Sequence, residues 1–335
     1  MRLARPLTAL PAAGLLLAAL SGCGDEDDGE SSSAGGDRPT VVVTTNILGD
    51  VVGDLVGDEA DVTVLMPAGA DPHDFQLSAR QAAELREADV LITNGAGFEE
   101  GMADSLEAAE SDGVTTYHAI DGVETIAYGE DAHAGEEAGE HAEEEGEPAE
   151  EEGEHADEGA DPHFFTDPDR VADAAEGIAE FLAEEIPALD TDGFRTSAEA
   201  EVEALRELAA EVEETLGAIA PDDRTMVTNH EVFGYFADRY DFEVVGVVIP
   251  GGGTGAEPNA QDLEELAGTI EAEGVPAIFA DVSSPETLSE ALAREVGDVE
   301  VVAVYSESLG EEGSGADTYA GMARTNAGRI VDALS

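Results

Sequence analysis

From residue 40 onward, short apolar segments rich in Val, Ile and Thr alternate with longer amphipathic segments. The strand-like segments are 40–46, 61–67, 89–95 and 115–120, then 225–230, 242–250, 277–283 and 299–308. The helical segments are 47–58, 78–88, 99–111 and 164–186, then 231–240, 260–274, 285–297 and 318–334. Because parallel strands need a crossover between them, this order predicts parallel sheets covered by helices.

A further helix is predicted from about Ser197 to Ala220, where apolar residues recur every three or four positions. It separates the two sets of strands, so we predict an α/β fold with two lobes joined by a long helix. The predicted divisions are an N-terminal lobe at 40–188, a linking helix at 189–221 and a C-terminal lobe at 222–335.

The first 22 residues differ from the rest. Arg2 and Arg5 precede an apolar run at 7–20, which as a helix would span about 21 Å, short of the roughly 30 Å hydrocarbon core. We interpret 1–22 as a signal peptide. Its last residues and the single cysteine, Leu-Ser-Gly-Cys23, resemble the lipobox of bacterial lipoproteins, which implies lipidation of Cys23. The alternative is an ordinary export signal with an incidental cysteine.

Residues 23–39 are small, polar and charged, as in a flexible tether. We therefore expect an exported protein, anchored to the outer face of the cell membrane by lipidated Cys23. Nothing else in the sequence is long and apolar enough to predict a membrane-spanning helix.

The chain carries 79 acidic residues against 13 basic ones, and every basic residue is arginine. This balance excludes nucleic acid as a partner, because phosphate binding requires the opposite charge. Since the acids are spread over the whole chain, they indicate an acidic surface of the halophilic type, in which salt screens self-repulsion. A surface that gathers cations is the alternative.

Residues 129–160 are almost entirely acidic or small and contain three of the seven histidines: His133, His141 and His155. With so little to bury, this segment is predicted to be a disordered loop. Its histidines are candidate auxiliary metal ligands that pass an ion onward. The other interpretation is a solvated insertion.

The pentapeptide Gly-Ala-Asp-Pro-His occurs twice, ending at His73 and at His163. Proline restricts its own backbone and that of the preceding residue, so each histidine leaves a defined turn. His230, Asp281 and Glu307 each lie near the carboxyl end of a strand-like segment, and ligands of open α/β sheets bind at carboxyl strand ends. Three imidazoles and one carboxylate form a plausible tetrahedral zinc shell.

The chain resembles the substrate-binding lipoproteins of zinc and manganese ABC transporters, and especially the zinc-uptake members. The similar segments are GADPHDF (69–75), ADVLITNGAGFE (88–99), DPHFFTDP (161–168), NHEVFGYFADRY (229–240) and DTYAGMARTN (317–326). The resemblance implies two α/β lobes, a rigid linking helix and one metal in the cleft between the lobes. It also implies an ABC permease as partner and, as metal ligands, His73, His163, His230 and Glu307.

Members of that family usually carry aspartate as the fourth ligand, so Asp281 is the alternative to Glu307. Manganese-binding members commonly carry glutamate where this chain has His230. Three nitrogen donors suit Zn²⁺ better than Mn²⁺, which prefers oxygen-rich shells. We therefore expect Zn²⁺, with Mn²⁺ as the alternative.

The predicted function is capture of Zn²⁺ by a monomeric binding protein and its delivery to a membrane permease. An extracellular metal buffer or adhesin could have the same sequence. A zinc hydrolase would need an open coordination position and a nearby general base. Four ligands would fill the shell, and only Glu231 is placed to act as a base, so we do not expect an enzyme.

Overall fold

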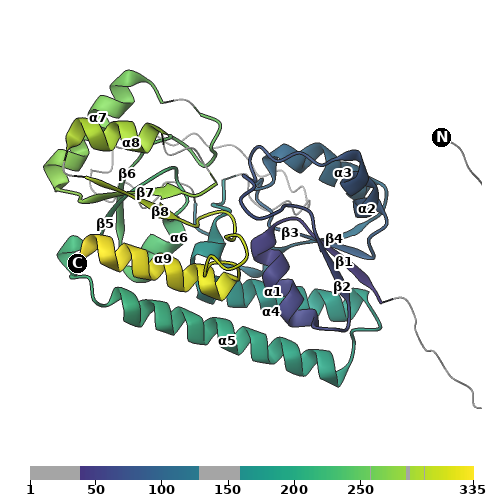
Figure 1. The fold of residues 1–335 in the computed structure, drawn as a ribbon. Helices are drawn as coiled ribbons and strands as arrows, with labels where there is room; N and C mark the ends of the chain where they lie inside the picture. Colours follow the sequence, from purple (N-terminus) through teal and green to yellow (C-terminus); the bar gives the residue numbers. More distant parts are fainter. Residues whose placement is uncertain (1–37, 128–158, 257, 284–286, 298) are drawn as a thin grey trace, which may run out of the picture. The chain divides into compact units, whose positions relative to one another are not determined.

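The computed structural model describes residues 38–127, 159–256, 258–283, 287–297 and 299–335. Within these ranges it contains two four-stranded sheets, and every strand pair in both is parallel (Figure 1). The first has the order β2-β1-β3-β4 and comprises β1 (Thr40–Val43), β2 (Asp61–Val64), β3 (Val90–Thr93) and β4 (Thr115–His118). The second has the order β6-β5-β7-β8 and comprises β5 (Thr225–Thr228), β6 (Glu243–Val247), β7 (Ala277–Asp281) and β8 (Glu300–Val304).

Helices occupy the segments between the strands, as the alternating pattern predicts. Those of the first half are α1 (Asn46–Val56), α2 (Ala79–Arg86), the 3₁₀ turn η1 (Glu100–Met102), α3 (Ala103–Ser111), the 3₁₀ turns η2 (Ala119–Gly122) and η3 (Phe164–Thr166), and α4 (Pro168–Glu185). Those of the second half are α5 (Asp192–Leu216), the 3₁₀ turn η4 (Pro221–Asp223), α6 (Gly234–Tyr240), α7 (Ala260–Glu273), α8 (Thr287–Val296) and α9 (Tyr319–Leu334). The predicted fold class, with two parallel-sheet lobes and a long helix, is confirmed.

The long helix α5 begins five residues before the predicted start at Ser197. Thr191 is extended, and its side chain accepts a hydrogen bond from the backbone N–H of Phe194 at 3.0 Å. This N-cap satisfies a donor at the helix start, and Phe194 is buried in the first turn. Periodicity located the helix interior, but the cap determined where the helix begins.

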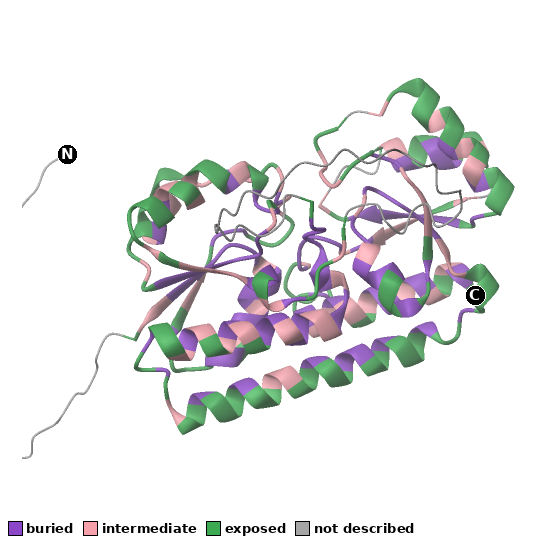
Figure 2. Ribbon diagram, turned by 180° about the vertical axis from the view of Figure 1, so that it is seen from behind, coloured by how far each residue is buried: buried purple, intermediate pink, exposed green. Residues whose placement is uncertain are grey.

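Helix α5 packs against α4, α1 and α9, and therefore contacts helices from both halves of the chain. Its buried side chains lie on one stripe and include Leu205, Leu208, Val212 and Leu216. The opposite side of α5 is exposed, as the alternating colours along this helix in Figure 2 show. One large cluster of buried apolar side chains spans α1, α4, α5 and α9 and is shared by the two sheets, whereas each sheet also packs a smaller separate cluster of its own.

Several predictions fall on residues that are not described. These are the signal peptide at 1–22, Cys23 and nearly all of the tether at 23–39, and the loop with His133, His141 and His155. The predicted division at 40–188, 189–221 and 222–335 remains a prediction. Within the described ranges, no helix combines the length and apolar character that crossing a membrane requires.

Candidate metal centre

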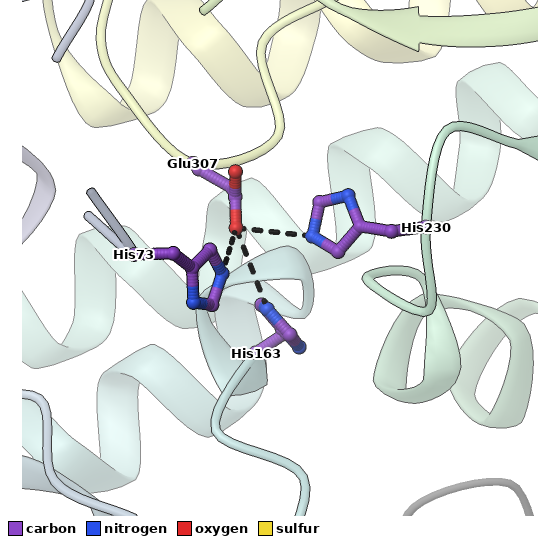
Figure 3. Close-up of side chains that lie close together, drawn as sticks. All are labelled: His73, His163, His230 and Glu307. Atoms are coloured by element: carbon purple, nitrogen blue, oxygen red, sulfur yellow. Dashed lines mark hydrogen bonds and ion pairs between the residues drawn. The ribbon is translucent and has the colours of Figure 1, made fainter. Parts of the chain in front are cut away.

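Four polar side chains from distant parts of the chain lie close together (Figure 3). His73 lies in the loop after β2, His230 follows β5 and Glu307 follows β8. His163 directly precedes η3. One candidate ligand atom from each residue lies within 4.8 Å of the others. The two sheets thus bring together all four residues that the resemblance implies.

The distances within this group are those of a ligand shell around a small cation. Oε1 of Glu307 lies 2.8 Å from Nε2 of His73, 3.0 Å from Nε2 of His230 and 3.6 Å from Nε2 of His163. Donor atoms at about 2.0–2.2 Å from a tetrahedral zinc ion are about 3.3 Å from each other. The three observed distances bracket this value, so an ion fits among the four atoms after small side-chain adjustments.

The group is almost completely shielded from solvent. The side chains of His163, His230 and Glu307 are fully buried, whereas that of His73 is 6% exposed. Oε2 of Glu307 has no hydrogen-bond partner among the described residues. A buried carboxylate oxygen without a partner is costly, and coordination of a cation would satisfy it.

The electrostatics of the metal-free group also favour binding of a cation. Burial alone would raise the pKa of Glu307, but the charge of His230 and hydrogen bonds from His163, His230 and His73 hold that pKa well below its usual value. Burial alone would lower the pKa of His163, but Asp161 and Glu307 raise it to about 9. A proton on His163 therefore occupies part of the place that a metal ion would take.

The two Gly-Ala-Asp-Pro-His segments share one hydrogen bond between aspartate and histidine and otherwise use their aspartates differently. Oδ1 of Asp71 accepts the backbone N–H of His73 at 2.9 Å, and Oδ1 of Asp161 accepts that of His163 at the same distance. Asp161 Oδ1 also lies 2.7 Å from Nδ1 of His163, which directs the Nε2 atom toward Glu307. Oδ2 of Asp71 instead accepts a hydrogen bond from Thr254 at 2.6 Å.

Asp281, the alternative fourth ligand, is not part of the group of four. Its carboxylate accepts the backbone N–H of Ser283 at 2.6 Å and that of Ser306 at 2.9 Å, and the hydroxyls of both serines also donate to it. Burial, followed by the charge of Glu307, raises the pKa of Asp281. Asp281 therefore holds the loop that carries Glu307 and leaves Glu307 as the candidate ligand.

Aromatic side chains that the sequence analysis did not single out surround the histidines. Phe98 makes edge contacts with His73 and His163, with ring centroids 5.6 Å apart in each pair. Phe165 contacts His163 at 5.8 Å and Phe98 at 5.1 Å. This apolar wall excludes water and strengthens electrostatic interactions within the site. Phe98 and Phe165 lie within two of the segments that resemble the transporter family, and this resemblance is the sequence feature that could have identified them.

Hydrogen bonds connect the segment carrying Glu307 to the first lobe. The hydroxyl of Ser308 accepts the side-chain amide of Asn46 at 2.9 Å and the backbone N–H of Gly69 at 2.7 Å. Oδ1 of Asn46 accepts the backbone N–H of Leu309 at 2.7 Å. These contacts fix the relative position of residues next to two candidate ligands, one from each lobe.

His118, which we expected to be structural, lies in β4 outside the group of four, with Nδ1 at 2.7 Å from Oγ1 of Thr93. His133, His141 and His155 lie outside the described residues, so their auxiliary role remains a prediction.

Comparison with known proteins supports the fold of two parallel-sheet lobes and a long helix. The family described as "Zinc-uptake complex component A periplasmic" (ZnuA) matches residues 41–333. The "Manganese-binding lipoprotein MntA" of Halalkalibacterium halodurans is 28% identical over 318 residues, covering 94% of each chain. The "Zinc-binding protein TroA" of Treponema pallidum is 28% identical over 312 residues, covering 92% of each.

A solved structure of the periplasmic zinc-binding protein TroA from Treponema pallidum superposes with a TM-score of 0.75 at 26% identity, covering 89% of this chain and 99% of that one. The likeness therefore extends over both sheets and the long helix. From the family match across nearly all of the described residues and the agreement in fold, we conclude that this chain belongs to the ZnuA family, the metal-binding components of ABC uptake transporters.

Proposed function

We propose that this protein captures Zn²⁺ outside the cell and delivers it to an ABC permease, with His73, His163, His230 and Glu307 as the ligands. One observation carries the proposal: a buried group of three imidazole nitrogens and one carboxylate oxygen, all within 4.8 Å of one another. This donor set matches a closed structural or storage shell, in which every coordination position of a tetrahedral zinc ion belongs to the protein.

The chemistry of the donors supports zinc over manganese. Three neutral nitrogens and one oxygen suit Zn²⁺, whereas Mn²⁺ favours shells with more oxygen. Manganese is the second candidate, because relatives of similar identity are named as manganese-binding and as zinc-binding proteins. If Glu307 bound the ion through both carboxylate oxygens, the shell would contain more oxygen and would favour Mn²⁺. The atom that decides between one and two oxygens is Oε2 of Glu307, which has no hydrogen-bond partner among the described residues.

The division of ligands between the lobes suggests how the ion is released. The first sheet and the segment before α4 carry His73 and His163, and the second sheet carries His230 and Glu307. A permease that contacts both lobes and displaces one by about 1 Å would spoil the coordination, because metal–ligand distances tolerate only about 0.2 Å of change. Release then requires no chemical step.

The place of action follows from the first residues of the chain. We propose that residues 1–22 direct export and that lipidated Cys23 anchors the protein, as a monomer, at the outer face of the membrane. Relatives in this family are named as lipoproteins, which supports the same arrangement here. The proposal would fail if radiolabelled fatty acid were not incorporated, or if Cys23→Ala left the incorporation unchanged.

The metal proposal is tested by the metal content of the whole chain after a chelator wash and exposure to an equal mixture of Zn²⁺ and Mn²⁺. His133, His141 and His155 are first changed to Gln, so that only the buried group is measured. We expect one zinc per chain by mass spectrometry. His230→Ala should lose it, and His118→Ala, the matched control outside the group, should retain it.

Manganese in place of zinc would overturn the assignment of the ion. Zinc that persists in His230→Ala and in Glu307→Ala would overturn the ligand set. If the protein bound one zinc per chain, but cells lacking it grew as well under zinc limitation as cells that have it, an extracellular metal buffer would be favoured over a component of a zinc transporter.

A further inference from the structure

Of the four candidate ligands, His73 alone is partly exposed, and its surroundings define the route by which an ion reaches the site. The other three side chains are fully buried, so the shortest way from solvent to the group lies past His73. Two structures near Nδ1 of His73 come from different lobes: Glu100 in η1 and the segment Gly251–Gly255 between β6 and α7.

Segment 251–255 lies beside His73. A Cβ atom added to Gly253 would lie 3.6 Å from Nδ1 of His73 and 3.7 Å from Oε2 of Glu100. The backbone at Gly253 therefore lies about one methyl group away from the imidazole and from the Glu100 carboxylate, and the segment flanks the exposed ligand. Gly251 has φ +95°, a conformation that glycine adopts without strain. Its carbonyl accepts the backbone N–H of Glu231, the neighbour of His230, at 3.3 Å.

One side-chain hydrogen bond joins this segment to the first lobe. Thr254 donates to Oδ2 of Asp71 at 2.6 Å, and Oδ1 of the same aspartate orders the turn that carries His73. In the second Gly-Ala-Asp-Pro-His segment, Asp161 instead orients His163, and the described structure gives it no such partner in the glycine-rich segment. The two Gly-Ala-Asp-Pro-His segments thus differ in one respect: only the aspartate beside His73, the partly exposed candidate ligand, is bonded to segment 251–255 in the described structure.

Glu100 is a carboxylate without a structural role comparable to those of the buried acids. Its side chain is 74% exposed, and Oε2 lies 3.9 Å from Nδ1 of His73. An exposed carboxylate beside the one accessible ligand is suited to hold a partly hydrated cation before or after it binds the buried group.

We propose that metal enters and leaves past His73, that the Thr254–Asp71 hydrogen bond keeps this route closed, and that Glu100 is a transient ligand along it. The proposal rests on the proposed function at the same site, and it concerns exchange rates rather than affinity. Neither Thr254 nor Glu100 belongs to the group of four. Each should therefore alter association and dissociation by the same factor and leave the equilibrium constant unchanged.

The test measures both rates with Zn²⁺ itself on the whole chain, with the three loop histidines changed to Gln. Stopped-flow mixing with zinc and with a fluorescent chelator gives association and dissociation, respectively. Thr254→Val keeps the side-chain shape and removes the donor, so both rates should rise about fivefold, the effect of one ordinary hydrogen bond. Thr254→Ser should restore the original rates.

Glu100→Gln should slow both rates by about threefold, because the transient ligand is lost in both directions. Glu273→Gln, at an exposed position at the end of α7, makes the same charge change and should alter neither rate.

Unchanged rates in Thr254→Val would overturn the closed route, and so would a change in affinity with unchanged association. Equal effects of Glu100→Gln and Glu273→Gln would overturn the role of Glu100. The variants are compared only after the protein without these substitutions has been shown to bind one zinc per chain. If that protein bound no zinc, the proposed function would be contradicted, and the exchange route would not be the part at fault.

Discussion

Gly234 is the position at which adding a single methyl group should disturb the metal centre most selectively. It is the first residue of α6, and a Cβ atom there would lie 2.6 Å from Oδ2 of Asp161. The same aspartate orients His163 through Oδ1. Gly234→Ala therefore acts on a candidate ligand through one intermediate side chain.

The size of the effect follows from the distances. Ordinary contact begins at 3.4 Å, so the carboxylate must retreat by about 0.8 Å from its position at 2.6 Å. Its hydrogen bonds to Nδ1 and to the backbone N–H of His163 are 2.7 and 2.9 Å long. A shift of this size lengthens at least one of these two hydrogen bonds beyond about 3.2 Å, so that bond is lost. Loss of an orienting partner lowers metal affinity by about 10- to 100-fold, or about 1.4–2.7 kcal/mol.

Competition with a chelator of known affinity would measure this loss, and circular dichroism would show whether the fold persists. Gly268→Ala in α7 is the matched control, because a Cβ there meets nothing within 4 Å. If Gly234→Ala bound zinc as tightly as the control, the orienting role of Asp161 would be refuted. A folded Asp161→Asn variant with unchanged affinity would lead to the same conclusion.

Four further outcomes are expected. Zinc affinity should rise with pH up to about 9 in calorimetric titrations, because binding must displace the proton that Asp161 and Glu307 hold on His163. The raised pKa of His163 stabilises the metal-free fold, and the stabilisation of about 3 kcal/mol is complete below pH 6.5 and lost as pH rises through 9. A denaturation midpoint of the metal-free protein that increases between pH 6.5 and 9 would contradict the raised pKa of His163. Ser308→Ala leaves the donors of Asn46 and Gly69 without their acceptor and should lower the free energy of unfolding by about 1–3 kcal/mol, measured with urea against Ser335→Ala as control. Zinc at about 100 times its dissociation constant should raise the unfolding free energy by about 2.7 kcal/mol, and an unchanged melting temperature would argue against a site formed only in the folded protein.

The sequence predicted the parts of this fold that repeat at regular intervals. Alternating apolar segments located the strands, and strand ends located His230 and Glu307, because parallel strands place their carboxyl ends at one edge. The starting point of α5 was placed too late, since the cap at Thr191 is a local contact that apolar periodicity does not record.

Side-chain contacts between distant segments were beyond such reasoning. The choice between Asp281 and Glu307 depends on Ser283 and Ser306, whose donors occupy the Asp281 carboxylate. The two identical pentapeptides predicted matching turns, yet the use of Asp71 depends on Thr254, 183 residues away. Propensity and pattern describe neighbours along the chain, whereas these contacts arise only when the lobes are packed.

The four candidate ligands come from four separate segments, and the first and last are 234 residues apart. Glu307 follows β8, the last strand of the second sheet. During synthesis, the group is therefore incomplete until all eight described strands have been made, and long-range pairing of this kind is slow. A partly folded chain offers at most a few scattered donors, and so it binds the ion weakly. With the proposed ligand set, metal loading would therefore report completion of folding, and a loaded molecule would be one whose two sheets have already assembled.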